Sequence, residues 1–160
     1  MNAIIKNWLK KSLRELFNSS DIELINRKLK EECINHRLAY YLEKYKPQQY
    51  SAYYVDLEYN KNNIDEKAVL VQGVPKHIRP DILIHRRTED VHDNLIAFEC
   101  KKAYLNANDK AKLRGLLCNG YNYQICLGIS YQPNKDIFLI YENDREFNNP
   151  RHVGKNQCQL

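Results

Sequence analysis

The chain has 160 residues, of which 43% are hydrophobic and 28% are charged, and its formal net charge is +5 at pH 7. This length suits one domain with a single core, and the composition is ordinary for a soluble globular protein. Every apolar run is too short for a membrane span, and the N-terminus lacks the apolar core of a secretory signal. We therefore expect cytoplasmic residence and no membrane partner. The mild positive charge permits binding to a phosphate backbone without requiring it.

Apolar side chains recur at helical spacing over residues 3–17, with lysines between them. This pattern predicts a basic amphipathic helix. Such a helix can touch a membrane or nucleic acid, but it more often packs on its own domain or on a partner subunit. Because the apolar face includes Trp8, we expect it to be covered in a homodimer.

A second helix is predicted from Ser20 to about Tyr45, where Ser20 and Glu23 have the spacing of a capping box. One apolar stripe along it includes His36, which indicates a helix packed between other elements. A histidine on such a stripe is more often a hydrogen-bonded core residue than a phosphate ligand, and both interpretations stay open. The stripe consists of Ile22, Ile25, Leu29, Cys33, His36 and Tyr40.

Residues 52–59 alternate as a strand that places Asp56 and Glu58 on the face opposite its apolar side chains. Two acids on one face fit simple solvent exposure. If that face looks into a catalytic cleft, Glu58 is a reserve metal ligand. Residues 60–78 are predicted to be a polar loop or hairpin, long enough to reach a substrate.

Two further strands, 79–85 and 94–102, carry the most informative residues. Strand alternation places Asp81 on one face of the first strand, and Glu99 with Lys101 on one face of the second. Antiparallel pairing would therefore bring two carboxylates and an ammonium onto one surface. Carboxylates are oxygen ligands for a divalent ion, and an ammonium can act on the attacking water or the scissile phosphate. This combination predicts a metal-dependent nuclease.

The pattern of an acidic residue, any residue and lysine occurs twice in the chain, and the surrounding sequence distinguishes the two cases. Asp65-Glu66-Lys67 lies in a polar stretch, which indicates a solvated loop. Glu99-Cys100-Lys101 closes an apolar run, and buried charges at a strand end are costly unless they meet partners or a metal. A strand-end salt bridge is the alternative, and the nearby Pro80-Asp81 favours a functional site.

Residues 108–121 are predicted to form a helix that turns leucines inward and Lys110, Lys112 and Arg114 outward. These three cations are candidate contacts to a nucleic-acid backbone, although an ordinary exposed helix face would look the same.

The rest of the chain is predicted to form two strands, near 124–131 and 136–142, and a loose polar tail at 146–160. The order is then two helices, three strands, one helix and two strands. This order predicts a single α/β domain over 1–145.

The motif Pro80-Asp81 followed by Glu99-Cys100-Lys101 resembles that of the PD-(D/E)XK, or restriction-endonuclease-like, nuclease superfamily. That superfamily has Pro-Asp on one strand and acidic-X-Lys on the next. The chain further resembles small, mostly uncharacterised bacterial members that carry additional motifs. The matching segments here are Glu31, His36-Arg37-Leu38, Val55-Asp56-Leu57-Glu58-Tyr59-Asn60 and Arg79-Pro80-Asp81. Cys100 stands where an aliphatic residue is usual, which affects nothing catalytic.

The resemblance implies a mixed β-sheet flanked by helices and a site for Mg²⁺ or Mn²⁺. Asp81 and Glu99 would coordinate the ion, with the backbone carbonyl of Cys100 as a further oxygen ligand. Lys101 would orient the attacking water or help to deprotonate it.

Glu31 matches the upstream glutamate that often completes the site in this superfamily. Glu32 is adjacent, and in a helix it lies nearer to His36 than Glu31 does. The choice between the two glutamates stays open.

The sequence thus predicts a metal-dependent nuclease that hydrolyses phosphodiester bonds, of DNA in preference to RNA. One alternative is a catalytically silent module of the same fold that binds nucleic acid or a partner protein; the intact Asp81, Glu99 and Lys101 favour the enzyme. Another is a metal enzyme acting on a small phosphoester, which needs similar ligands but a closed pocket.

Overall fold

The protein combines one mixed β-sheet with helices on both faces. The computed structural model describes residues 1–62, 65–71, 73–88, 90, 93–118, 120–132, 138–144 and 149–153. In these residues, six strands form the sheet in the order β1-β6-β7-β8-β9-β10. Neighbouring strands are antiparallel except for the parallel pair β7 and β8. The strands are β1 (Tyr54–Leu57), β6 (Ile82–His85), β7 (Asn94–Lys101), β8 (Ile125–Ser130), β9 (Phe138–Asp144) and β10 (Asn149–Val153).

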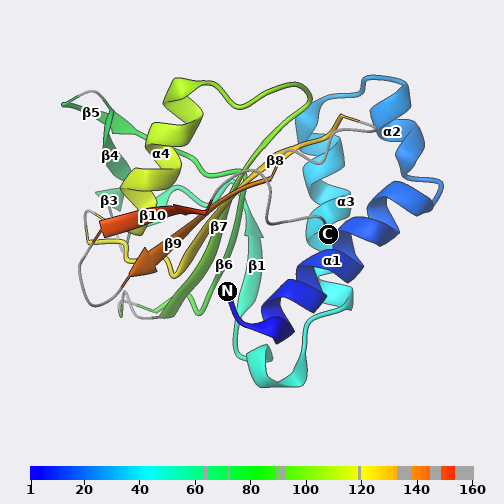
Figure 1. The fold of residues 1–160 in the computed structure, drawn as a ribbon, viewed down its shortest axis with the longest axis horizontal. Helices are drawn as coiled ribbons and strands as arrows, with labels where there is room; N and C mark the ends of the chain where they lie inside the picture. Colours follow the sequence, from blue (N-terminus) through cyan, green and yellow to red (C-terminus); the bar gives the residue numbers. More distant parts are fainter. Residues whose placement is uncertain are drawn as a thin grey trace.

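Each face of the sheet has its own apolar cluster and its own cover (Figure 1). The helices α1 (Ala3–Asn18), α2 (Ile22–Asn26) and α3 (Glu31–Lys44) lie on one face. The helix α4 (Ala107–Leu117) and the second of two short hairpins cover the other. The hairpins are β2 (Lys61–Asn62) with β3 (Asp65–Glu66), and β4 (Ala68–Val71) with β5 (Val74–His77). The expected α/β class with a mixed sheet is confirmed.

Helix α1 occupies nearly the predicted range, and its apolar face is covered within the chain. Trp8 is 2% exposed, its indole N–H donates to the Leu42 carbonyl at 2.8 Å, and its ring stacks on Tyr50 with centroids 5.6 Å apart. The observation that favoured a homodimer is therefore removed.

The predicted helix from Ser20 to Tyr45 is wrong, because the segment forms two helices, α2 and α3. Lys28 adopts φ 57°, a left-handed conformation that a continuous helix cannot contain. Asp21, rather than Ser20, stands at the N-cap position of α2, and Glu23 pairs with Arg27 at 3.2 Å.

Because of this break, the buried side of α3 differs from the one predicted for a continuous helix. Cys33 and His36 are exposed, and so is Tyr40, at 48%. The buried stripe instead contains Ile34 and Leu38, which repeat at helical spacing from the new helix start. The interpretations of His36 and Cys33 as core residues are therefore wrong.

Strand β1 is shorter than the predicted 52–59, because Glu58 adopts φ 50° and ends it. The polar segment that follows is largely ordered: Val69 and Val71 of β4 are buried in the same apolar cluster as residues of α4. Lys67 is 4% exposed, so its assignment to a solvated loop is wrong. Burial lowers the pKa of this lysine to about 8.

Strands β6 and β7 pair antiparallel as expected, with Leu83 opposite Ala97. Helix α4 connects β7 to its parallel neighbour β8, as a parallel pair requires a crossover. The helix begins earlier than predicted because Asn106 forms a capping box with Asp109.

The segment at 146–160, expected to be a loose tail, includes strand β10, which pairs antiparallel with β9. Residues 145–148 and 154–160 lie outside the described residues. Among the helices described, none has the length and apolar character needed to cross a membrane.

Candidate active site

The start of β6, the end of β7 and the first turns of α3 and α4 meet at one end of the sheet. Asp81 immediately precedes β6, and its backbone N–H donates to the Phe98 carbonyl at 3.2 Å, which continues the ladder with β7. Glu99 and Lys101 lie at the end of β7, on the sheet face that carries α4. The strand pairing thus brings the predicted acidic and basic side chains together.

The ammonium of Lys101 lies at the centre of these groups. Its Nζ is 3.0 Å from Glu99 Oε1, 3.8 Å from Glu31 Oε2, and 3.9 Å from both Asp81 Oδ2 and Asp109 Oδ1. We call Glu31, Asp81, Glu99 and Asp109 the carboxylate cluster. Two of the five groups lie in β7, one immediately precedes β6, and two lie in the first turns of α3 and α4.

A second ammonium, that of Lys112, contacts the same Glu99 Oε1 at 2.9 Å. The expectation that Lys112 points outward with Lys110 and Arg114 is therefore wrong. Asp109 and Lys112 are three residues apart, so they share the face of α4 that turns toward the sheet. Arg114 is exposed and Lys110 is half-buried.

Backbone N–H groups hold three of the carboxylates in place. Asp81 Oδ2 accepts from the Cys100 N–H at 2.6 Å, and Glu31 Oε1 accepts from the Lys102 N–H at 2.8 Å. Asp109 Oδ2 accepts from the Asn106 N–H at 2.9 Å, as part of the capping box. Bonds to main-chain donors fix these carboxylates before any ligand arrives.

The pKa values of two groups are displaced by this environment. Burial, and then the nearby charge of Glu99, raise the pKa of Asp81 to about 6. Burial alone would lower the pKa of Lys101, but the carboxylates of Glu99, Asp81 and Asp109 outweigh it and raise that pKa above its ordinary value. Lys101 therefore stays protonated, which favours a role in orienting water or stabilising charge over one in deprotonation.

The charges of the cluster are not balanced. Among the side chains described, it contains four carboxylates against the two ammonium groups of Lys101 and Lys112. Two negative charges remain when all four acids are ionised. A divalent cation would neutralise them.

As they stand, no three histidine, cysteine, aspartate or glutamate side chains of the described residues are grouped to hold a metal ion. The ammonium of Lys101 keeps the carboxylate oxygens 3.0 to 3.9 Å from its nitrogen, whereas Mg²⁺ requires oxygens at about 2.0–2.1 Å. Asp81 Oδ2 and Glu99 Oε1 lie at most about 7 Å apart, since they are 3.9 and 3.0 Å from one nitrogen. A metal ion at the centre of these four carboxylates would require this ammonium to move.

The donor chemistry of the cluster nevertheless fits a hard cation, because every candidate ligand is an oxygen. The backbone of Cys100 adds a further one. Its N–H faces β6 and reaches Asp81, and in a strand the N–H and carbonyl of one residue point toward the same neighbour. The Cys100 carbonyl therefore points to the side of β7 on which Asp81 lies.

The other acidic candidates lie in different surroundings. Glu31 is in the cluster, whereas Glu32 is exposed. The carboxylate of the reserve ligand Glu58 pairs with Arg79 at 3.3 Å, and only its backbone N–H reaches Asp81, at the carbonyl, at 3.1 Å. Sequence reasoning missed Asp109 and took Lys112 as outward-facing. Their spacing on the predicted helix indicates that the two side chains share a face, but not which way that face turns.

No protein-family model, curated protein or solved structure matches this chain. The arguments about function therefore start from the geometry of the carboxylate cluster and its two lysines.

Proposed function

We propose that the protein is a metal-dependent nuclease with a restriction-endonuclease-like fold, which hydrolyses phosphodiester bonds of nucleic acid, DNA in preference to RNA. The observation that carries this proposal is the position of Lys101, within 4 Å of acids from two adjacent strands and two helices. A mixed sheet with helices on both faces supports the proposed fold.

Asp81 and Glu99 would hold Mg²⁺ or Mn²⁺, together with the carbonyl of Cys100. When bound, such an ion activates water and stabilises negative charge on the phosphoryl group. Burial of Glu99, which is 3% exposed, places these ligands in a region of low dielectric, where interactions between charges are strong.

Lys101 would donate hydrogen bonds to the attacking water or to a phosphoryl oxygen. Because it remains protonated, it can stabilise the negative charge that develops in the transition state. Lys112, from α4, holds Glu99 in place through their ion pair at 2.9 Å.

Glu31 is the group best placed to accept a proton from the attacking water. Its side chain is 31% exposed, against 17% for Asp81, 5% for Asp109 and 4% for Glu99. Solvent access allows it to pass that proton on, and a general base must lie within hydrogen-bond reach of the water it acts on.

Cleavage assays on the full chain test this proposal. Wild type and Lys101→Ala would be incubated with linear duplex, circular duplex, single-stranded DNA and RNA, in Mg²⁺, in Mn²⁺ and in chelator. We expect the wild type to cleave at least one substrate and to lose this activity in chelator. Lys101→Ala should also lose cleavage, while its affinity for nucleic acid changes only slightly. Lys76→Ala, which removes an exposed lysine of β5, should cleave like the wild type. Cleavage that persists in chelator, or equally in Lys101→Ala, would contradict the proposal.

One observation favours a second candidate, the silent module that binds nucleic acid without cutting it. Lys101 already occupies the centre of the carboxylate cluster, and no metal-binding group is formed there by the residues that the structure describes. The same assay separates the two, because binding of every substrate without cleavage by the wild type would favour the module.

A further inference from the structure

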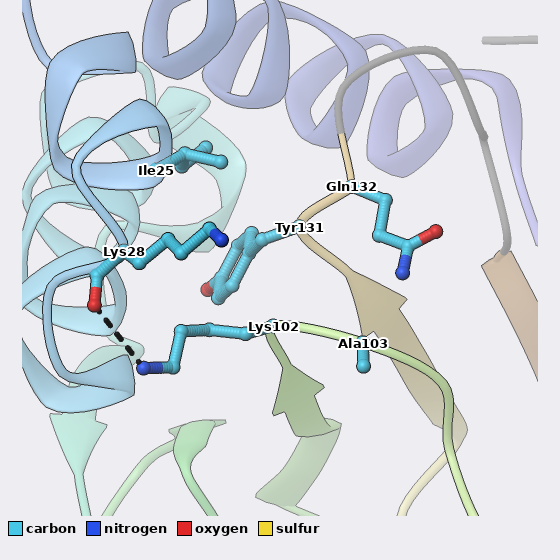
Figure 2. A pocket seen from close by; sticks show the side chains of 6 residues that line it. All are labelled: Ile25, Lys28, Lys102, Ala103, Tyr131 and Gln132. Atoms are coloured by element: carbon cyan, nitrogen blue, oxygen red, sulfur yellow. Dashed lines mark hydrogen bonds between the residues drawn. The ribbon is translucent and has the colours of Figure 1, made fainter.

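An open pocket adjoins the carboxylate cluster on the side of α2 and α3. It has a volume of about 430 Å³ and lies between the turn that joins these helices and the ends of β7 and β8 (Figure 2). The residues that line it are Ile25, Lys28, Lys102, Ala103, Tyr131 and Gln132.

The pocket is tied to the cluster through two backbone contacts. The N–H of Lys102 donates to Glu31 Oε1 at 2.8 Å, while the other oxygen of Glu31 lies 3.8 Å from Lys101 Nζ. The N–H of Tyr131 donates to the carbonyl of Lys101 at 2.8 Å. The pocket therefore lies next to the carboxylate cluster.

The charge of the pocket is opposite to that of the cluster. Two of its lining residues are lysines and none is acidic. Within the described part of the chain, neither Lys28 nor Lys102 forms an ion pair with a carboxylate; the ammonium of Lys102 donates to the Lys28 carbonyl at 3.4 Å. Figure 2 shows both lysine side chains extending beside Tyr131. Two unneutralised ammonium groups at one hollow attract an anion.

The remaining lining suits the rest of a nucleotide. Ala103 is exposed and offers apolar surface against which a sugar can lie, whereas Ile25 and Tyr131 are 8% and 1% exposed and form the floor of the pocket. The amide of Gln132 offers a hydrogen-bond donor and an acceptor at the rim. A phosphate on the two lysines, a sugar against Ala103 and a hydrogen bond to Gln132 would use these groups.

We propose that this pocket binds the nucleotide next to the scissile bond, with its phosphate held between Lys28 and Lys102. This proposal rests on the proposed nuclease function and names the strand-binding subsite of that site. It places the flanking phosphate on lysines and leaves the scissile phosphate for the carboxylate cluster.

Binding of a short oligonucleotide without cleavage tests the subsite. A 5′-fluorescein-labelled single-stranded DNA of twelve nucleotides would be titrated, in chelator and at several salt concentrations, with wild type, Lys28→Gln, Lys102→Gln and the double variant. The matched control is Lys76→Gln, which removes the same charge from exposed strand β5. Both pocket lysines are exposed, so the substitutions leave the core intact.

We expect the double variant to bind roughly tenfold more weakly. The slope of log K against log salt should become shallower by about 0.7 for each phosphate that a lysine no longer neutralises. Lys76→Gln should stay within a factor of about two of the wild type, as expected for one distant surface charge. An oligonucleotide affinity and salt slope that match the wild type in the double variant would overturn the proposal. So would lysine-dependent binding of thymidine 5′-monophosphate alone, with no such effect on the oligonucleotide.

The outcome is separable from that of the nuclease proposal, because cleavage is measured on the same proteins with Mg²⁺ or Mn²⁺. Lysine-dependent binding by a wild type that cuts nothing would support the pocket and refute the nuclease. Cleavage by a wild type whose double variant binds equally well would refute the pocket alone.

Discussion

At the scale of single residues, Lys101 is the residue that lies close to all four acids of the carboxylate cluster. Its ammonium lies within 4 Å of four carboxylates, which would otherwise repel one another in a partly buried setting. In this position the ammonium stands where a metal cation could bind. It can also donate hydrogen bonds to a substrate.

Lys101→Met should therefore destabilise the fold at pH 7.5 in the absence of metal. Removing one partner of a buried pair costs several kcal/mol, and with the 24% exposure of this side chain we expect roughly 2 kcal/mol. Lowering the pH toward 5, or adding Mn²⁺, should recover part of the loss by neutralising the acids. Urea denaturation would measure it; a loss that is the same at both pH values and insensitive to Mn²⁺ would contradict this explanation.

The raised pKa of Asp81 predicts a pH dependence of stability. Its folded-state pKa of about 6 exceeds the ordinary value of 3.8, so the folded protein binds the proton more tightly than the unfolded chain does. This contribution is fully present below the ordinary value and is lost as the pH rises through about 6. It amounts to about 2–3 kcal/mol, since one pKa unit corresponds to about 1.4 kcal/mol.

Asp81→Asn should accordingly raise the free energy of unfolding at pH 7.5 in chelator and flatten its decline between pH 4 and 6. Urea denaturation at several pH values would measure both effects. Asp65→Asn, at an exposed position of β3, is the control and should leave the profile unchanged. If Asp81→Asn keeps the wild-type decline, the buried charge of Asp81 is not its source.

Part of the site could be predicted at this scale. Alternation along two strands was enough to place Asp81, Glu99 and Lys101 on one surface, because the side-chain period of a strand is fixed. The inward position of Lys112 was not predictable from residue type, since lysine on a helix most often faces solvent. Its direction depends on how α4 is rotated against the sheet, which is a property of the packed molecule.

At the scale of elements, the contact of α4 with β4 sets how α4 is rotated against the sheet. Gly115 lies so close to β4 that a Cβ atom there would stand 2.5 Å from the Cβ of Val69. The missing side chain lets the helix approach the hairpin while Asp109 and Lys112 face the cluster.

Gly115→Ala should destabilise the protein despite the better helix propensity of alanine. Overpacking costs about 1–3 kcal/mol, and the 2.5 Å contact with Val69 puts the cost near the upper end of this range. The propensity gain is about 1 kcal/mol, so we expect a net loss of about 2 kcal/mol in urea denaturation. Asn108→Ala, exposed in the first turn of α4, is the control for introducing alanine into this helix and should change stability by no more than about 0.5 kcal/mol. A Gly115→Ala protein as stable as the wild type would show that the two elements separate easily.

The elements themselves were predicted unevenly. The two strands of the motif and α1 followed from clear periodicity, whereas the break between α2 and α3 did not. Lys28 adopts the left-handed conformation there, which costs roughly 1–2 kcal/mol for a residue with a Cβ. Tertiary packing of both helices on the sheet outweighs this cost, and periodicity cannot reveal such a conflict.

At the scale of the whole molecule, the sheet separates two apolar clusters and brings groups from four elements together at one end. Burial of Lys67, which joins β3 to β4, is likewise a whole-molecule effect: its Nζ lies 4.8 Å from the centre of the Tyr59 ring and 6.0 Å from that of Tyr121. No local feature of its polar segment indicates such cover. The carboxylate cluster likewise depends on the whole fold, because its acids lie far apart in the chain.

Diffraction from crystals soaked in Mn²⁺ tests most directly whether the carboxylate cluster is a metal site. We predict an anomalous peak within about 2.0–2.5 Å of an oxygen from both Asp81 and Glu99. The Lys101 ammonium should have moved beyond its present 3.0 Å from Glu99. Anomalous peaks found only elsewhere, with Lys101 still at the centre of the four carboxylates, would contradict a metal site at this cluster.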